Sequence, residues 1–212
     1  MDIRIINTKN RIQAGLIAAI KMKPLYEIKD KDIIQEAQVS SSSYYKYYSD
    51  KSDVLHDLEK DLFSEFKLAL SADSKNWGTT NHAPSKKDIS RLVDSNINEL
   101  INYFSVHEDM LAPLISKNGD AGFSTQLINI TTMTIEKLII YYFHLYNQEY
   151  ILKKDKMKLI LVAKRYALSF LGPLFVWLEY SDEMTVKETK RLMKQMILNS
   201  PYDISTHGFQ IR

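Results

Sequence analysis

The sequence predicts an all-α protein, and three observations lead to that prediction. Apolar residues recur at three- and four-residue spacing along most of the 212-residue chain, as they do on one face of a helix. No segment of useful length alternates apolar and polar residues as a half-buried strand does. The chain has only 6 glycines and 5 prolines, which are few for a β fold rich in turns. We therefore expect an N-terminal three-helix, helix-turn-helix domain over residues 1–52 and a C-terminal helical bundle over residues 53–212.

The composition excludes some chemistry and leaves the partner open. The chain contains no cysteine, which rules out disulfides, cysteine-zinc sites and thiol nucleophiles. A net charge of +2 is too small to establish an anionic partner. Residues 1–51 hold nine Lys and Arg against six Asp and Glu. This weak excess fits a surface that faces phosphate, and an ordinary solvated surface explains it almost as well.

The sequence indicates a cytoplasmic protein without a membrane partner. The N-terminal segment MDIRIINTKNR mixes charged and apolar residues, unlike a signal peptide. The segment to test as a membrane span, Leu159–Leu178, contains Lys164 and Arg165 near its middle. Each would cost about 2.5–3.5 kcal/mol at a bilayer centre. We interpret the segment as a buried helix.

Capping residues and apolar spacing divide the N-terminal part into short helices. Thr8, Asp30 and Ser40 are the residue types that cap helix N-termini. Pro24 ends the first helix because proline lacks a backbone N–H. We expect helices over residues 8–22, from residue 30 to the turn at Val39, over 41–47 and over 51–72.

The C-terminal part begins with a polar linker and continues as long helices. The predicted linker covers residues 71–87, and the tail after Pro201 is expected to fray. The segment 154–179 is apolar almost all round, so we expect it to be buried on several sides, with a kink at Gly172-Pro173. Helices are expected over residues 85–104, 107–116, 124–146, 154–179 and 185–199.

The segment from Asp30 to Lys51 has the layout of a helix-turn-helix DNA reader. A short second helix of this kind presents its first residues to base edges in the major groove. Small hydroxyl side chains allow close approach, and tyrosine and lysine side chains offer contacts to phosphate or thymine methyls. Tyr44 and Tyr48 are expected to face the core. The predicted DNA-facing residues are Ser41, Ser42, Ser43, Tyr45, Lys46 and Tyr47, with Lys51 at a phosphate-favouring helix N-terminus. The alternative is a polar, tyrosine-rich turn.

These motifs resemble the TetR family of bacterial transcriptional regulators over about residues 8–62. The matching residues are Thr8, Ile12 and Ala14, then IIQEAQVS at 33–40, SSYYKYY at 42–48 and SDKSDVL at 49–55. Gln38 and Ser42 stand where the family has glycine, and Gln38 is costly if the turn needs a positive φ. The resemblance implies a homodimer that binds a pseudo-palindromic operator in double-stranded DNA. It also implies a repressor, which is the most frequent role in this family.

A C-terminal bundle of this kind would dimerise and bind a small-molecule effector. The segments 154–179 and 185–199 would supply a four-helix dimer interface, although a monomeric core helix explains the first of them too. Effector pockets are mostly apolar with few polar groups. For every candidate, ordinary core packing is the plainer explanation. The candidate pocket residues are Tyr103, Phe104, Met110, Phe123, Met133, Tyr141, His144 and Tyr166.

The sequence does not indicate an enzyme, a metal site or a cofactor. It contains no glycine-rich phosphate loop, no HExxH motif and no GxSxG serine motif. His107, Glu108 and Asp109 resemble a cation site, but an exposed helix start explains them better. Two alternatives to a DNA-binding regulator remain open. One is a helical interaction module that acts through a protein partner without specific DNA binding, and the other is a small-molecule enzyme built on the bundle.

Overall fold

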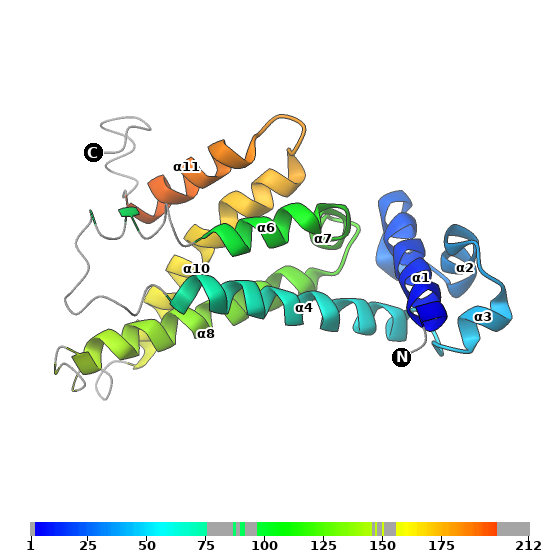
Figure 1. The fold of residues 1–212 in the computed structure, drawn as a ribbon, viewed down its shortest axis with the longest axis horizontal. Helices are drawn as coiled ribbons and strands as arrows, with labels where there is room; N and C mark the ends of the chain where they lie inside the picture. The colour runs from blue at the N-terminus through cyan, green and yellow to red at the C-terminus, as the bar shows by residue number, and fades with distance from the viewer. Residues whose placement is uncertain are drawn as a thin grey trace. The chain divides into compact units, whose positions relative to one another are not determined.

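The computed structural model describes residues 3–75, 87, 90–91, 97–145, 147, 150 and 156–198. These residues form helices joined by turns, and no strand occurs among them, which confirms the predicted all-α class (Figure 1). The chain forms two compact units. The N-terminal unit comprises Met1–Glu65 with His107–Ser124, and the C-terminal unit comprises Phe66–Val106 with Thr125–Arg212.

The N-terminal unit is built on the packing of its first two helices. It contains α1 (Ile3–Met22), the 3-10 turn η1 (Leu25–Glu27), α2 (Asp30–Ala37), α3 (Ser41–Tyr45), the start of α4 (Lys51–Lys75) and α7 (Glu108–Ile115). Gly15 lets α1 approach α2 closely, because an added Cβ would lie 2.7 Å from the Ala37 nitrogen and 2.8 Å from the Ile33 oxygen. The core that results contains Ile12, Leu16, Ile20, Ile33, Tyr44, Val54 and Leu58.

Helix α1 begins earlier than the sequence indicated. It starts at Ile3 rather than near Thr8. The predicted capping role of Thr8 is therefore wrong: the residue lies inside the helix, and its hydroxyl donates to the Arg4 carbonyl at 2.8 Å. The added turn carries Ile3 and Ile6, whose side chains are 70% and 39% exposed. The spacing of apolar residues did not predict this added turn, because none of its side chains is buried.

The turn between α2 and α3 does require a positive φ. Gln38 ends α2 in the left-handed region, with φ 52° and ψ 45°. A side chain is strained there because its Cβ crowds the following carbonyl. The Arg11 guanidinium donates to the Ala37 and Gln38 carbonyls at 3.0 and 2.6 Å. Arg11 thus satisfies carbonyls that the end of α2 leaves without helical partners.

We predict that Gln38→Gly raises the free energy of unfolding by about 0.5–1 kcal/mol, because glycine adopts this conformation without strain. The measurement is chemical denaturation followed by circular dichroism. Gln35→Gly is the matched control: it places the same substitution inside α2 and should lower stability by about 1 kcal/mol. Equal losses for both variants would contradict the strain at Gln38.

A pair of carboxyl groups lies within the N-terminal unit. Glu59 on α4 is half-buried, and one of its carboxyl oxygens is buried without a hydrogen-bond partner in the described structure. Burial raises the pKa of Glu59 from 4.5 to about 7, and the nearby Asp120 carboxyl adds to that rise. The Glu59 carboxyl therefore keeps its proton to a higher pH in the folded protein than in the unfolded chain.

We predict that Glu59 lowers stability as pH rises from about 4.5 to about 7. In that window the folded protein binds more protons at Glu59 than the unfolded chain does, so unfolding becomes easier as pH increases. Glu59→Gln should remove this part of the pH dependence, measured by urea denaturation across the window. Glu36→Gln, an exposed change on α2, is the control and should keep the wild-type slope. Parallel curves for Glu59→Gln and wild type would exclude the effect.

The C-terminal unit packs around an aromatic core. It contains the end of α4, α6 (Asn98–Val106), most of α8 (Ala121–Leu145), α10 (Lys156–Glu179) and α11 (Val186–Leu198), with α11 lying along α10 (Figure 1). Phe104 is fully buried and has aromatic contacts with Phe66, Tyr103 and Phe175. Thr185 and Glu188 form a reciprocal cap at the start of α11, which agrees with the predicted helix start.

Some predicted segments lie partly outside the described residues. Of the predicted linker, residues 71–75 belong to α4, and residues 76–86 lie outside the described part of the chain. The predicted helix over residues 85–104 is described as α6 from Asn98 onward. The tail after Pro201 lies outside it as well.

Helix α10 has an exposed apolar side, although the sequence predicted burial on several sides. It continues through Gly172 and Pro173, while Leu161, Leu168 and Val176 are 65%, 46% and 48% exposed. Among the described residues it is the one helix with the length and apolar composition of a membrane span. Core helices of soluble proteins can meet the same criterion, so this is weak evidence for a membrane.

Candidate nucleic-acid interface

Helix α3 is too short to be stable by itself and depends on its caps. It has five residues, Ser41–Tyr45. The Ser40 hydroxyl oxygen accepts from the Ser43 backbone N–H at 3.1 Å, which confirms Ser40 as the N-cap. An isolated helix of this length does not form in water, because the entropy cost of nucleation exceeds the free energy gained from one turn of hydrogen bonds. Tertiary contacts must therefore hold α3 in place.

Two tyrosines attach the α3 segment to the core, as predicted. Tyr44 is fully buried and Tyr48 is 4% exposed. The Tyr48 hydroxyl donates to the Asp57 carboxylate at 2.7 Å, and the same carboxylate accepts from the Lys9 ammonium at 2.8 Å. Burial raises the pKa of both tyrosines above the usual value, so both hydroxyls remain protonated donors.

The Asp30 carboxylate joins three helices. Asp30 was expected to cap α2, but it is the first residue of that helix. The residue at the N-cap position is Lys29, and its backbone N–H donates to the Asp32 carboxylate at 2.8 Å. One Asp30 oxygen accepts from the Tyr44 hydroxyl at 3.2 Å and from the Lys51 backbone N–H at 2.9 Å. The other accepts from the Tyr45 hydroxyl at 3.3 Å. A single side chain on α2 thus positions α3 and the start of α4.

The Lys51 ammonium lies against main-chain carbonyls. It donates to the Leu25 carbonyl at 2.7 Å and to the Ile28 carbonyl at 2.8 Å, with a longer contact of 3.4 Å to Tyr26. These carbonyls belong to the connection between α1 and α2. A DNA phosphate would have to compete with them for the Lys51 donors. The predicted phosphate contact of Lys51 therefore stays a prediction.

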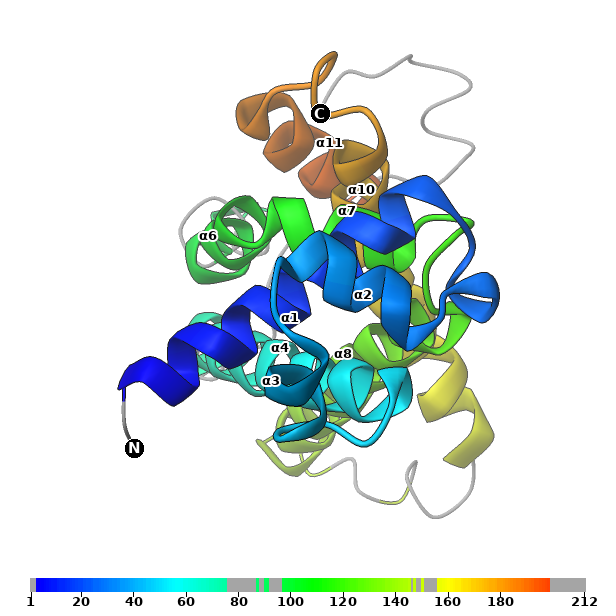
Figure 2. The ribbon, with the colours of Figure 1, turned by 90° about the vertical axis from the view of Figure 1, so that its right-hand side faces the viewer.

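The other predicted DNA-facing residues lie on α3, the short helix labelled in Figure 2, and on the two residues that follow it. Ser41, Ser42 and Lys46 are exposed, whereas Ser43 and Tyr47 are half-buried. Tyr45 is 55% exposed although its hydroxyl reaches Asp30. The Lys46 ammonium lies 5.4 Å from the centre of the Tyr47 ring, a cation–π distance. This α3 surface offers hydroxyl, aromatic and ammonium groups to a partner.

We predict that Lys51→Met lowers the free energy of unfolding by about 1–3 kcal/mol, because partly buried carbonyls lose their donor. Chemical denaturation measures the change. Lys46→Met is the matched control, and we expect it to stay within about 0.5 kcal/mol of wild type because Lys46 is exposed. Equal stabilities for Lys51→Met and Lys46→Met would show that the ammonium–carbonyl contacts contribute little.

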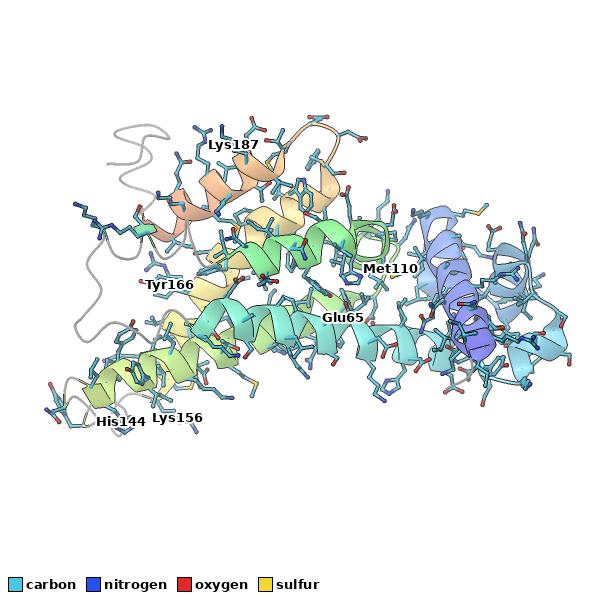
Figure 3. The ribbon with its side chains drawn as sticks, in the orientation of Figure 1. Glu65, Met110, His144, Lys156, Tyr166 and Lys187 are labelled. Carbon is cyan, nitrogen blue, oxygen red and sulfur yellow. The ribbon has the colours of Figure 1, made fainter. Side chains whose placement is uncertain are left out.

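The candidate effector residues are divided between the two units and between core and surface. Tyr103 and Phe104 are buried in the aromatic core of the C-terminal unit, whereas Met110 and Phe123 belong to the N-terminal unit. The remaining three on α8 are exposed: Met133, Tyr141 and His144. Tyr166 lines a cavity of about 190 Å³. Figure 3 labels Met110 on α7, His144 at the end of α8 and Tyr166 on α10.

The cavity lies in the C-terminal unit and is lined mostly by residues that sequence reasoning did not select. They come from α4, the start of α6, α8, α10 and α11. On α8 the lining residues follow helical spacing, a signal present in the sequence but shared with ordinary core positions. Asp73 was assigned to the linker, so its role was missed. The lining residues are Leu70, Asp73, Ser74, Ile97, Leu100, Thr131, Thr134, Ile135, Leu138, Ile139, Tyr142, Tyr166, Phe170 and Ile197.

Asp73 is a buried acid in the wall of this cavity. It is 7% exposed, and its two oxygens accept from the Glu99 and Leu100 backbone N–H groups at 3.2 and 2.9 Å. Burial raises the pKa of Asp73, although these two hydrogen bonds oppose the rise. Asp73 therefore caps the N-terminus of α6 from a neighbouring helix. Among the described residues, no group of three or more His, Cys, Asp and Glu is arranged to hold a metal ion.

Comparison with known proteins gives one distant relationship. The chain is 29% identical over 96 residues to the uncharacterized HTH-type transcriptional regulator YxbF of Bacillus subtilis (strain 168). The match covers 45% of this chain and 25% of that protein, so the chain spans only a quarter of the relative's length. No protein-family model matches the chain. No solved structure matches it either.

This similarity supports a transcription regulator of the helix-turn-helix type and, weakly, a non-enzymatic role. It agrees with the described α2–turn–α3 arrangement, in which a buried tyrosine and a serine cap hold a short helix with an exposed polar face. The match is partial and distant, so it does not identify the TetR family within that broader class.

Proposed function

We propose that this chain is a TetR-like transcriptional regulator that binds double-stranded DNA with the α3 surface. The observation that carries the proposal is a short, externally braced helix that presents Ser41, Ser42 and Lys46 to solvent directly after a left-handed turn at Gln38. A DNA-reading helix must be rigid and must lack bulky groups at its N-terminal end. Bacterial regulators of this class act in the cytoplasm, and we propose that location here.

Each residue of the α3 surface has a proposed role. Ser41, Ser42 and Ser43 lie at the N-terminal end, where hydroxyls accept or donate to base edges. Tyr45 and Tyr47 present ring faces to sugar or thymine methyl groups, and the Tyr47 hydroxyl meets a phosphate. The Tyr45 hydroxyl does so only if it leaves Asp30. Lys46 neutralises a phosphate, and Lys51 does so if it leaves one of its carbonyl partners. We propose residues 1–52 as the DNA-binding part and residues 53–212 as the part that dimerises and binds effector.

Homodimerisation is supported by the exposed side of α10. Leu161, Leu168 and Val176 recur at seven- and eight-residue spacing and so follow one face of the helix. An ideal Cβ at Gly172 would meet nothing within 4 Å, so a second helix has room to approach there. A two-fold pairing of such faces would bury them and present two α3 surfaces to successive half-sites.

We further propose that the protein is a repressor released by a small-molecule effector. A dimer reads two half-sites only at one separation of its α3 helices. A ligand that binds better to another separation would lower the affinity for the operator. The cavity in the C-terminal unit supports an effector site, because it is largely apolar with a few polar groups.

One observation favours a second candidate, an interaction module that acts through a protein partner. The Lys51 ammonium and the Tyr45 hydroxyl both have partners within the unit. Among the described residues of the α3 surface, Lys46 is then the cation that faces solvent. Sequence-specific readers of DNA draw much of their affinity from several phosphate contacts. A steep salt dependence with sequence preference would exclude this candidate.

We predict that purified protein enriches an inverted repeat from a random duplex pool at roughly physiological salt. On the selected site, Lys46→Ala should weaken binding to every sequence and flatten the salt slope by about one per protomer. Ser42→Ala should instead change the preferred base at one position of each half-site. Fluorescence anisotropy across a salt series measures both effects.

Lys137→Ala is the matched control, because it removes the same charge from an exposed position on α8. It should leave affinity and salt slope unchanged. Enrichment of a direct repeat or a single half-site would contradict the dimer. No enrichment by folded protein would favour the interaction module, and uniform losses for Ser42→Ala would argue against α3 as the reader.

A further inference from the structure

The cavity of the C-terminal unit has walls that are almost entirely apolar. Leucine, isoleucine and phenylalanine side chains from α4, α6, α8 and α10 form most of its surface. Its volume is about 190 Å³, and it is partly open to solvent. An apolar cavity of roughly 150 Å³ accepts a benzene molecule. The space here therefore suits one substituted ring rather than a long chain or a fused polycycle.

The serine and threonine hydroxyls in the wall accept hydrogen bonds more readily than they donate them, whereas Tyr142 and Tyr166 add two phenols to the lining. The Thr131 hydroxyl donates to the Leu127 carbonyl at 2.9 Å, and the Thr134 hydroxyl donates to the Ile130 carbonyl at 3.1 Å. The Ser74 hydroxyl likewise donates to the Ser71 carbonyl at 3.0 Å. Each hydroxyl proton is thus used within its own helix, and each oxygen keeps a lone pair. A ligand that matches these three hydroxyls brings a donor.

The charge in the wall disfavours an anion. Asp73 lines the cavity, and no Lys or Arg is among its described lining residues. A carboxylate ligand would lie near the Asp73 carboxyl with no cation in the lining to face it, which is costly in an apolar site. Lys190 acts on Asp73 from outside the lining. A cation gains little either, because both Asp73 oxygens already accept from the N-terminal N–H groups of α6. An ammonium group would lose its hydration for a carboxylate that is already compensated.

We infer that this cavity binds a compact, uncharged, largely apolar molecule that carries one hydrogen-bond donor, of the size of a phenol with a short alkyl substituent. The donor meets a hydroxyl oxygen of α8 or the Asp73 carboxyl, and the ring and alkyl group fill the space among the leucines and isoleucines. The inference deepens the effector part of the proposed function. Its binding test does not depend on DNA.

The test uses four probes on the full chain: 4-propylphenol, propylbenzene, 4-propylbenzoate and 3-phenylpropylammonium. Isothermal titration at neutral pH should show 4-propylphenol binding roughly five- to tenfold more tightly than propylbenzene, which lacks the donor. The anion and the cation should each bind at least about tenfold more weakly than the phenol. Tighter or equal binding of any of the other three probes would overturn the proposed ligand class.

Methyl NMR of the wild-type protein locates the site without a variant. Addition of 4-propylphenol should shift the isoleucine methyls that line the cavity, those of Ile97, Ile135, Ile139 and Ile197. The methyls of Ile12, Ile20 and Ile33, in the core of the N-terminal unit, should not move. Shifts confined to the second set, or no shifts, would overturn the assignment of the site.

A matched pair of variants completes the experiment. Leu138→Trp fills the cavity, whereas Lys137→Trp places the same side chain at the exposed neighbouring position. Phenol binding should fall by more than tenfold in the first and remain in the second. Retained binding in a folded Leu138→Trp protein would contradict the inference, and if that variant does not fold, the NMR result decides. Loss of phenol binding with retained operator selection would refute the ligand class alone and leave the DNA-binding proposal standing.

Discussion

The described N-terminal unit depends on the carboxylate of Asp30. Helices α2 and α3 are eight and five residues long, too short to persist without outside contacts. Asp30 accepts from Tyr44, Tyr45 and the first N–H of α4, so one acceptor fixes the ends of three elements. The Lys51 ammonium adds a second tie by holding the carbonyls that precede α2. The contacts that hold the α3 surface in place thus come from outside α3.

These ties also determine what the surface offers a partner. Tyr45 is exposed and yet hydrogen-bonded to Asp30, so its ring is available while its hydroxyl is engaged. Lys51 has its charge beside carbonyls rather than in solvent. The side chains that position α3 are thus also among those proposed to bind DNA. The strained Gln38 serves the same end, because the left-handed turn directs the chain from α2 into α3 at a local energetic cost.

In the C-terminal unit, one buried acid serves both the fold and the cavity. Asp73 caps α6 across space, and its side chain forms part of the cavity wall. A molecule in the cavity would therefore touch the group that fixes the start of a helix. On the apolar side of α10, Leu161, Leu168 and Val176 remain exposed among the described residues. Packing inside the unit accounts for the cavity, and the proposed homodimer would cover the exposed face of α10.

The sequence by itself determined the helical class, most helix ends and the Ser40 cap, because spacing and capping are local properties. It also indicated that Tyr44 and Tyr48 are core residues and that Gln38 is costly at a positive φ. Only the tertiary structure decided that Lys51 faces carbonyls, that Asp30 joins three helices and that Asp73 borders a cavity. Those contacts join residues 14 to 27 positions apart, and their partners are main-chain atoms or hydroxyls, which are common in every sequence. No periodicity in the sequence indicates which of these groups will meet, so only the folded structure shows the pairs.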